Sequence, residues 1–222
     1  MAINNQGLAP QRSKKKELTR EAILVAARTV LASDGPDALS LSKVANLAGI
    51  NRGTAYQHFE TREDLVRATL SSVSELLATR VFGHLGGAKA GQVAGATERP
   101  VFEVITGIVA FAVENPTLCR IWRFEVLSSD RPGDDIFFRQ FEAATQELAE
   151  SEYSEDGIDV EALSVMMLAG YFLWPVWVGA RAKTPEQRQV MIDRMRKEVL
   201  RMSLHGILRA DQFPHLEQLL HE

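Results

Sequence analysis

Apolar residues recur at helical spacing, three or four residues apart, along most of this 222-residue chain. No segment alternates apolar and polar residues as a half-buried strand does, and no internal repeat is found. Breaks rich in Gly and Pro separate the helical segments, most clearly at residues 83–95, which include five glycines. The pattern therefore predicts an all-α fold.

The predicted helices begin and end at recognisable signals. Ser40 and Asn51 are placed to cap two short helices, and Thr61 with Asp64 three residues later is placed to cap a longer one. Pro175, inside a later helix, predicts a kink or a break near Trp174. The predicted helices span residues 17–33, 41–48, 52–59, 61–81, about 101–112, about 137–148, 160–181 and 186–209.

Charge is divided unevenly along the chain, although the formal net charge is only −4. Residues 1–70 contain ten Lys and Arg against seven acidic residues, and the remainder is acidic. This asymmetry is typical of a nucleic-acid-binding end joined to a region with another task. Cys119 is the single cysteine, which excludes an intrachain disulfide, and no apolar stretch near the start suits a signal peptide. We expect a cytoplasmic protein.

Residues 163–180 carry no charge and reach the length at which a membrane span becomes conceivable. Pro175 and two glycines lie inside the segment. The basic residues that follow it would lie outside if residues 1–70 were cytoplasmic, against the positive-inside tendency. A helix buried in a large helical core is the favoured interpretation, and no membrane partner is expected.

The segment from Ser40 to Phe59 carries the main functional signal. Two short helices joined through Ala48-Gly49-Ile50 fit a helix-turn-helix, in which Gly49 permits a positive φ. The second helix of such a motif enters the major groove of DNA with its N-terminal residues facing base edges. Arg and Gln, which this helix carries, can bind guanine and adenine edges through two hydrogen bonds.

Residues of about 17–66 resemble the DNA-binding domain of the TetR family of bacterial transcriptional regulators. The resemblance rests on the run VANLAGINRGTAYQHFETREDL, residues 44–65, which follows the family's spacing of caps, small residues and apolar residues. Asn51 stands where the family usually has Ser, Ala55 where it usually has Leu or Ile, and Arg62 where it usually has Lys. The departure at Ala55 leaves the tilt of the second helix open.

The resemblance implies two domains, residues 1–66 for DNA binding and 67–222 for effector binding and dimerisation. It also implies that Tyr56 and His58 contact phosphates, as do Lys43 and Arg62, whereas Arg52, Thr54 and Gln57 are the candidates for base contacts. Phe59 is expected in the core. The complete set of candidate DNA-binding residues is Lys14, Lys15, Lys16, Ser40, Lys43, Asn51, Arg52, Gly53, Thr54, Tyr56, Gln57, His58 and Arg62. The three lysines precede the first predicted helix and form either an arm along DNA or a solvated tail.

In the family, the last two long helices usually pair in a homodimer. Ile192, Met195, Val199 and Met202 follow a 3-4-3 spacing that suits such a seam or, equally, the core of a single chain. The family's effector pocket lies among the middle helices, where this chain is rich in aromatic residues and methionine. The candidate effector contacts are Phe102, Phe111, Arg120, Trp122, Arg123, Phe137, Phe141, Met167, Tyr171 and Trp174. Arg120 and Arg123 suit either an acidic group of an effector or surface pairs with Glu125 and Glu142.

Enzyme motifs are missing from the sequence. The five histidines show no metalloprotease spacing, and there is no P-loop, dinucleotide-binding glycine motif or serine elbow. We expect no catalytic residue, metal site or cofactor. The sequence predicts a DNA-binding repressor that a small, largely apolar effector releases from a palindromic operator. The alternative is a DNA-binding protein of this fold controlled by a protein partner.

Overall fold

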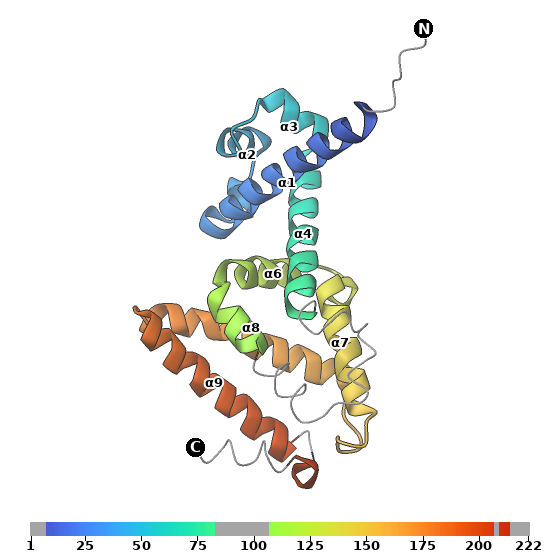
Figure 1. Cartoon of the computed structure of the whole chain (residues 1–222), viewed down its shortest axis with the longest axis vertical. Coiled ribbons are helices and arrows are strands. Elements are labelled where there is room, and N and C mark those ends of the chain that lie inside the picture. The colour runs from blue at the N-terminus through green and yellow to red at the C-terminus, as the bar shows by residue number, and fades with distance from the viewer. Residues whose placement is uncertain (1–7, 83–106, 207–208, 214–222) are drawn as a thin grey trace. The chain divides into compact units, whose positions relative to one another are not determined.

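The computed structural model describes residues 8–82, 107–206 and 209–213, and this part of the chain contains helices and no β-strand (Figure 1). The all-α fold predicted from the sequence is confirmed. Contacts divide the chain into two compact units, Met1–Val73 and Ser74–Glu222. The division falls inside one long helix, and the domain boundary expected after residue 66 stays a prediction.

The first unit consists of α1 (Leu8–Asp34), α2 (Leu41–Leu47), α3 (Arg52–His58) and the first part of α4 (Arg62–Phe82), with the short 3-10 helix η1 (Pro36–Ala38) between α1 and α2. An apolar stripe on α1 forms much of the core of this unit, and its members are at most 7% exposed: Ile23, Ala26, Ala27, Val30 and Leu31. Phe59 and Leu65 are buried as well. These side chains hold the short helices against α1.

The first helix begins nine residues earlier than predicted, at Leu8 instead of Glu17. Residues 8–16 lack an apolar stripe, which is why periodicity did not reveal them. Their Lys, Gln and Arg side chains favour a helix, and Pro10 lies in the first turn, where its missing N–H costs nothing. Lys14, Lys15 and Lys16 are therefore exposed residues of α1 and form neither a separate arm nor an unstructured tail.

All three predicted N-terminal caps are present. The Ser40 side chain accepts a hydrogen bond from the backbone N–H of Lys43 at 3.2 Å, and the Asn51 side chain accepts one from Gly53 at 2.7 Å. Thr61 and Asp64 exchange hydrogen bonds at the start of α4, each side chain accepting from the other residue's backbone N–H. Because these bonds satisfy the free N–H groups of each first turn, the helix starts are fixed by the sequence.

The second unit contains the rest of α4, helical residues 107–114, α6 (Pro116–Ser128), α7 (Ile136–Ala149), α8 (Val160–Arg181) and α9 (Pro185–Gly206). An aromatic cluster joins α6, α7 and α8 in its core. The Trp122 ring meets Phe137 edge-on at 5.5 Å and Phe172 edge-on at 5.0 Å, and Phe137 stacks on Phe172 at 5.5 Å. Such contacts add to the free energy gained by burying the rings.

α8 continues through Pro175, so of the predicted kink or break near Trp174 the break is wrong, and the kink stays a prediction. By length and composition α8 is apolar enough to cross a membrane, and 39% of the apolar window is buried within the chain. One face packs inward, with Leu168 and Phe172 at most 1% exposed. The opposite face leaves Met166 and Trp177 44–56% exposed, so α8 is not buried on every side as the sequence suggested.

Most residues of the 3-4-3 stripe on α9 pack against other parts of the same chain. Ile192 and Val199 are each 4% exposed, and Met195 is half-buried with its Cε near Gly170 of α8. Met202 is 42% exposed. The spacing alone could not separate a seam within one chain from a seam between two, and for Ile192 and Val199 the partner is this chain itself.

Candidate nucleic-acid interface

α2 and α3 form a helix-turn-helix around a small core. Val44, Ala45 and Ala55 are at most 2% exposed, so the alanine that departs from the family pattern is fully packed. Gly49 has a φ of +66°, which a side chain would strain, and Ile50 donates its backbone N–H to the carbonyl of Ala45 at 3.0 Å. These contacts fix the turn between the two helices.

The exposed side of α3 presents most of the predicted DNA-binding residues. Arg52, Gly53, Tyr56 and Gln57 are exposed, whereas Thr54 and His58 are half-buried. The side chains of Ser40 and Asn51 are used as helix caps. α3 thus offers one charged, one aromatic and one amide side chain outward from a backbone kept accessible by Gly53.

Arg52 and Tyr56 lie one helical turn apart on α3 and contact each other twice. The Arg52 guanidinium lies over the Tyr56 ring at 5.3 Å from its centre, and Nη2 donates to the Tyr56 hydroxyl at 3.2 Å. A stacked arginine loses less conformational freedom when it binds a base. The pair therefore places the guanidinium beside the aromatic ring before DNA arrives.

Two of the predicted phosphate contacts already have partners in their own chain. The Lys43 ammonium pairs with Asp34 at 2.7 Å, and this contact lowers the pKa of the Asp34 carboxyl. The Arg62 guanidinium donates to the backbone carbonyls of Leu39 at 2.9 Å and Pro36 at 2.7 Å. Arg62 therefore ties α4 to the segment that leads into α2, a structural role that sequence spacing could not reveal.

We expect Arg62→Met to lower the stability of the first unit by about 1.5–3 kcal/mol, since two backbone carbonyls lose charged donors. Amide hydrogen exchange in α2 measures this change directly. Arg67→Met is the matched control, because Arg67 is exposed and its one ion pair among the described residues is with Asp64 at 3.5 Å. Equal protection of α2 in both variants would contradict the structural role of Arg62.

His58 is the one histidine of residues 1–73, and it is half-buried at the end of α3. Burial lowers its pKa, and the nearby Lys16 and Arg20 cations lower it further, while Glu17 opposes them. The free protein therefore holds a neutral imidazole at pH 7. A phosphate at this position would favour the imidazolium, so binding would take up a proton.

If His58 contacts phosphate, affinity for operator DNA rises as the pH falls from about 8 to about 6, through the ordinary range of a histidine. We expect a gain of about three- to tenfold in wild type and a flat profile in His58→Gln. Fluorescence anisotropy at constant ionic strength measures both. Parallel pH profiles would show that His58 does not contact DNA.

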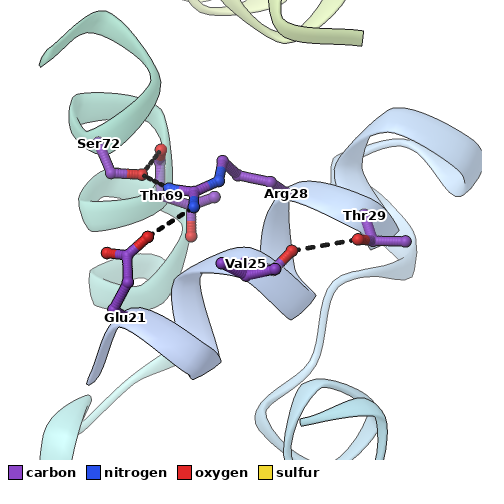
Figure 2. Close-up of polar contacts among 6 residues, drawn as sticks. All are labelled: Glu21, Val25, Arg28, Thr29, Thr69 and Ser72. Atoms are coloured by element: carbon purple, nitrogen blue, oxygen red, sulfur yellow. Dashed lines mark hydrogen bonds and ion pairs between the residues drawn. The ribbon is translucent and has the colours of Figure 1, made fainter. Parts of the chain in front are cut away.

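A polar contact between α1 and α4 escaped the sequence analysis. The Arg28 side chain donates to the Ser72 hydroxyl at 3.0 Å and to Glu21 at 2.7 Å, as Figure 2 shows. Ser72 in turn donates to the carbonyl of Thr69 at 2.7 Å. Glu21 and Arg28 lie two helical turns apart, and this spacing could have indicated that they pair. Their contact with Ser72 of α4 could be found only from the three-dimensional structure.

The candidate effector residues are distributed through the second unit. Trp122, Phe137, Phe141 and Tyr171 are buried, Arg120 is exposed, and Phe102 lies outside the described residues. The half-buried members are Phe111, Arg123, Met167 and Trp174. Within the described residues neither arginine forms an ion pair with Glu125 or Glu142, and no group of His, Cys, Asp and Glu suited to a metal ion is found there.

A family model matches part of the first unit, and solved structures match the fold of most of the chain. Residues 23–69 match the family model described as bacterial regulatory proteins, tetR family. The chain has a TetR-family DNA-binding domain. No match is found in a comparison with curated proteins.

The TetR-family fold extends over the described chain. A TetR family transcription regulator from Marinobacter aquaeolei VT8 is similar with a TM-score of 0.63 and 19% identity, covering 84% of this chain and 97% of its own. A gamma-butyrolactone receptor, described as an ArpA-like protein, gives a TM-score of 0.62 and 19% identity over 93% and 96% of the two chains. The SmeT–triclosan complex gives a TM-score of 0.59 and 19% identity, covering 88% of this chain and 94% of its own. At such identities the likeness establishes the TetR-family fold.

Proposed function

We propose that this TetR-family chain is a sequence-specific repressor that a small, largely apolar effector releases from a palindromic operator. The observation that carries the proposal is the exposed face of α3, where Arg52, Tyr56 and Gln57 project from a capped helix-turn-helix. Arg52 and Gln57 have the geometry to read base edges, and Thr54 adds a smaller contact. Tyr56 and His58 are assigned to the phosphates that flank these bases.

The lysines of α1 supply further attraction for DNA. Lys14, Lys15 and Lys16 are exposed on one helix, whereas Lys43 would have to exchange Asp34 for a phosphate. Contacts of this kind release counterions and strengthen binding without reading sequence. We therefore assign affinity to α1 and specificity to α3.

Dimerisation is assigned to the exposed apolar face of α8. Its large side chains are 44–56% exposed and share one side of the helix: Val165, Met166, Leu173, Val176 and Trp177. Exposed apolar side chains gathered on one side of a helix are typical of interaction surfaces. A second copy of the chain would bury this face, and two recognition helices would then meet two half-sites.

Trp177→Asp is expected to weaken the dimer by at least about 100-fold, because a charge replaces a large apolar side chain once in each copy. Sedimentation equilibrium measures the change. Leu127→Asp is the matched control, since Leu127 is 86% exposed on α6 and lies off the proposed interface. Dimers of equal stability in both variants would move the interface away from α8.

An effector site in the second unit is supported by the aromatic residues of α6, α7 and α8. Apolar and aromatic walls with a few polar groups are typical of small-molecule sites. The proteins of similar fold include a gamma-butyrolactone receptor and a triclosan complex. Release would require the effector to prefer the conformation that does not fit the operator.

Selection from a pool of random duplexes tests the proposed function. At a salt concentration of about 0.15 M, where non-specific attraction is weakened, we expect enrichment of an inverted repeat. The enriched duplex then serves to search for compounds that release the protein. Failure of the folded dimer to enrich any sequence would overturn the repressor proposal.

A further inference from the structure

Two buried hydroxyl groups on α8 have no hydrogen-bond partner among the described residues. They belong to Tyr171, which is 3% exposed, and Ser164, which is fully buried. The two residues are seven positions apart, so they lie on the same side of the helix about 10 Å apart along its axis. Most buried polar groups in proteins are paired, and an unpaired one calls for an explanation.

Several polar side chains of the same unit are paired, whereas Arg123 Nε on α6 and Glu147 Oε2 on α7 also lack a hydrogen-bond partner among the described residues. The Trp174 Nε1 donates to the carbonyl of Met191 at 3.0 Å, and Trp122 Nε1 donates to Asp135 at 2.9 Å. The Ser74 hydroxyl also donates to Asp135. Tyr171 and Ser164 differ from the two other unpaired groups because both are uncharged hydroxyls and both lie on the same side of α8.

The Tyr171 hydroxyl lies deep inside the second unit. Burial raises the pKa of its hydroxyl far above the usual range, and no charged group among the described residues contributes to this shift. The charged residues of α8 are Glu161 and Arg181, at its two ends. The neighbouring Phe172 packs in the aromatic cluster with Trp122 and Phe137. Tyr171 thus remains a protonated donor in a setting of low polarity.

We propose that the Tyr171 hydroxyl, with Ser164 as a second polar point, anchors an uncharged, mostly apolar effector through an acceptor oxygen such as that of a ketone, ester or lactone. This inference rests on the proposed function and names the chemical class of its effector. No charged group among the described residues shifts the pKa of Tyr171, so a carboxylate at its hydroxyl would lack a cation from this part of the chain to offset the loss of its hydration. A carbonyl oxygen needs no charge partner and satisfies the hydroxyl directly.

The first experiment measures thermal unfolding without any added compound. Tyr171→Phe removes a hydroxyl that has no partner, so the melting temperature should stay unchanged or rise. Ser74→Ala is the reference variant, because its hydroxyl is bonded to Asp135 and its loss should lower the melting temperature. A drop in Tyr171→Phe as large as that in Ser74→Ala would show a structural role for the Tyr171 hydroxyl and overturn the proposal.

The second experiment titrates the full-length protein with matched probes. One set is 2-octanone, octanoate and octylammonium, and the other is acetophenone, benzoate and benzylammonium. We expect a ketone to bind the wild type about three- to tenfold more tightly than Tyr171→Phe, the loss of one hydrogen bond, and the ions to bind neither. Equal ketone affinity in both proteins, preference for an ion, or no binding of either ketone would overturn the assignment.

These outcomes are distinguishable from failure of the proposed function. Operator selection uses the same protein without a ligand, so an enriched inverted repeat with no ketone binding rejects the effector class alone. Ketone binding through Tyr171 without an enriched operator rejects the repressor and leaves a ligand-binding protein of TetR-family fold.

Discussion

Arg52→Ala should reduce affinity for the selected operator by about 30-fold or more while leaving the dimer intact. A bidentate arginine–base contact contributes about 1–3 kcal/mol of discrimination, and a dimer loses it in both half-sites. Affinity for a shuffled duplex should change much less, since the remaining lysines still attract phosphates. Fluorescence anisotropy with the two duplexes separates the specific loss from the general one.

The contact between Arg52 and Tyr56 provides a matched control for that result. Tyr56→Phe keeps the ring beneath the guanidinium and removes only the hydroxyl at 3.2 Å, so most of the specificity should remain. Tyr56→Ala removes the stacking surface and the proposed phosphate contact, and should approach the Arg52→Ala loss. Full operator affinity in both alanine variants would contradict the assignment of α3 as the reading helix.

Asp135→Ala should lower the free energy of unfolding of the second unit by about 3–5 kcal/mol. The Asp135 carboxylate accepts hydrogen bonds from Trp122 Nε1 at 2.9 Å and from the backbone N–H of Phe138 at 2.8 Å, and a third from the Ser74 hydroxyl. It thereby connects α4, α6 and the start of α7. Its removal leaves several donors without a partner, which costs more than losing one bond.

Tryptophan fluorescence follows this unfolding selectively, because all three tryptophans lie in the second unit. Asp134→Ala is the matched control, since its side chain is exposed and pairs with Arg131 on the surface at 3.2 Å. We expect a change of at most about 1 kcal/mol there. Similar destabilisation by both variants would show that Asp135 does not connect these helices.

The sequence predicted best where short-range chemistry decides the structure. The caps at Ser40, Asn51 and Thr61 and the turn at Gly49 depend on residues close in the chain, and all four are present. The helix-turn-helix was therefore recognisable residue by residue. Its amphipathic first helix was recognisable from the apolar stripe, although its polar first turns were not.

Contacts between distant residues were not predictable from spacing. Arg62 matched a family position associated with phosphate, but its two carbonyl partners lie 23 and 26 residues away. The stripe on α9 had equal support as a seam within or between chains, and Ile192 and Val199 proved to be buried in their own chain. Periodicity shows that a face is apolar, while the partner of that face depends on the fold.

Helical phasing of the operator tests the central claim, that one dimer reads two half-sites with its two α3 helices. Insertion of about five base pairs, half a turn of DNA, between the half-sites places them on opposite faces. We expect affinity to fall by at least about 100-fold, and part of this loss to be recovered when about ten base pairs are inserted. Unchanged affinity after the half-turn insertion would show that the two half-sites are read independently and would contradict binding by one dimer.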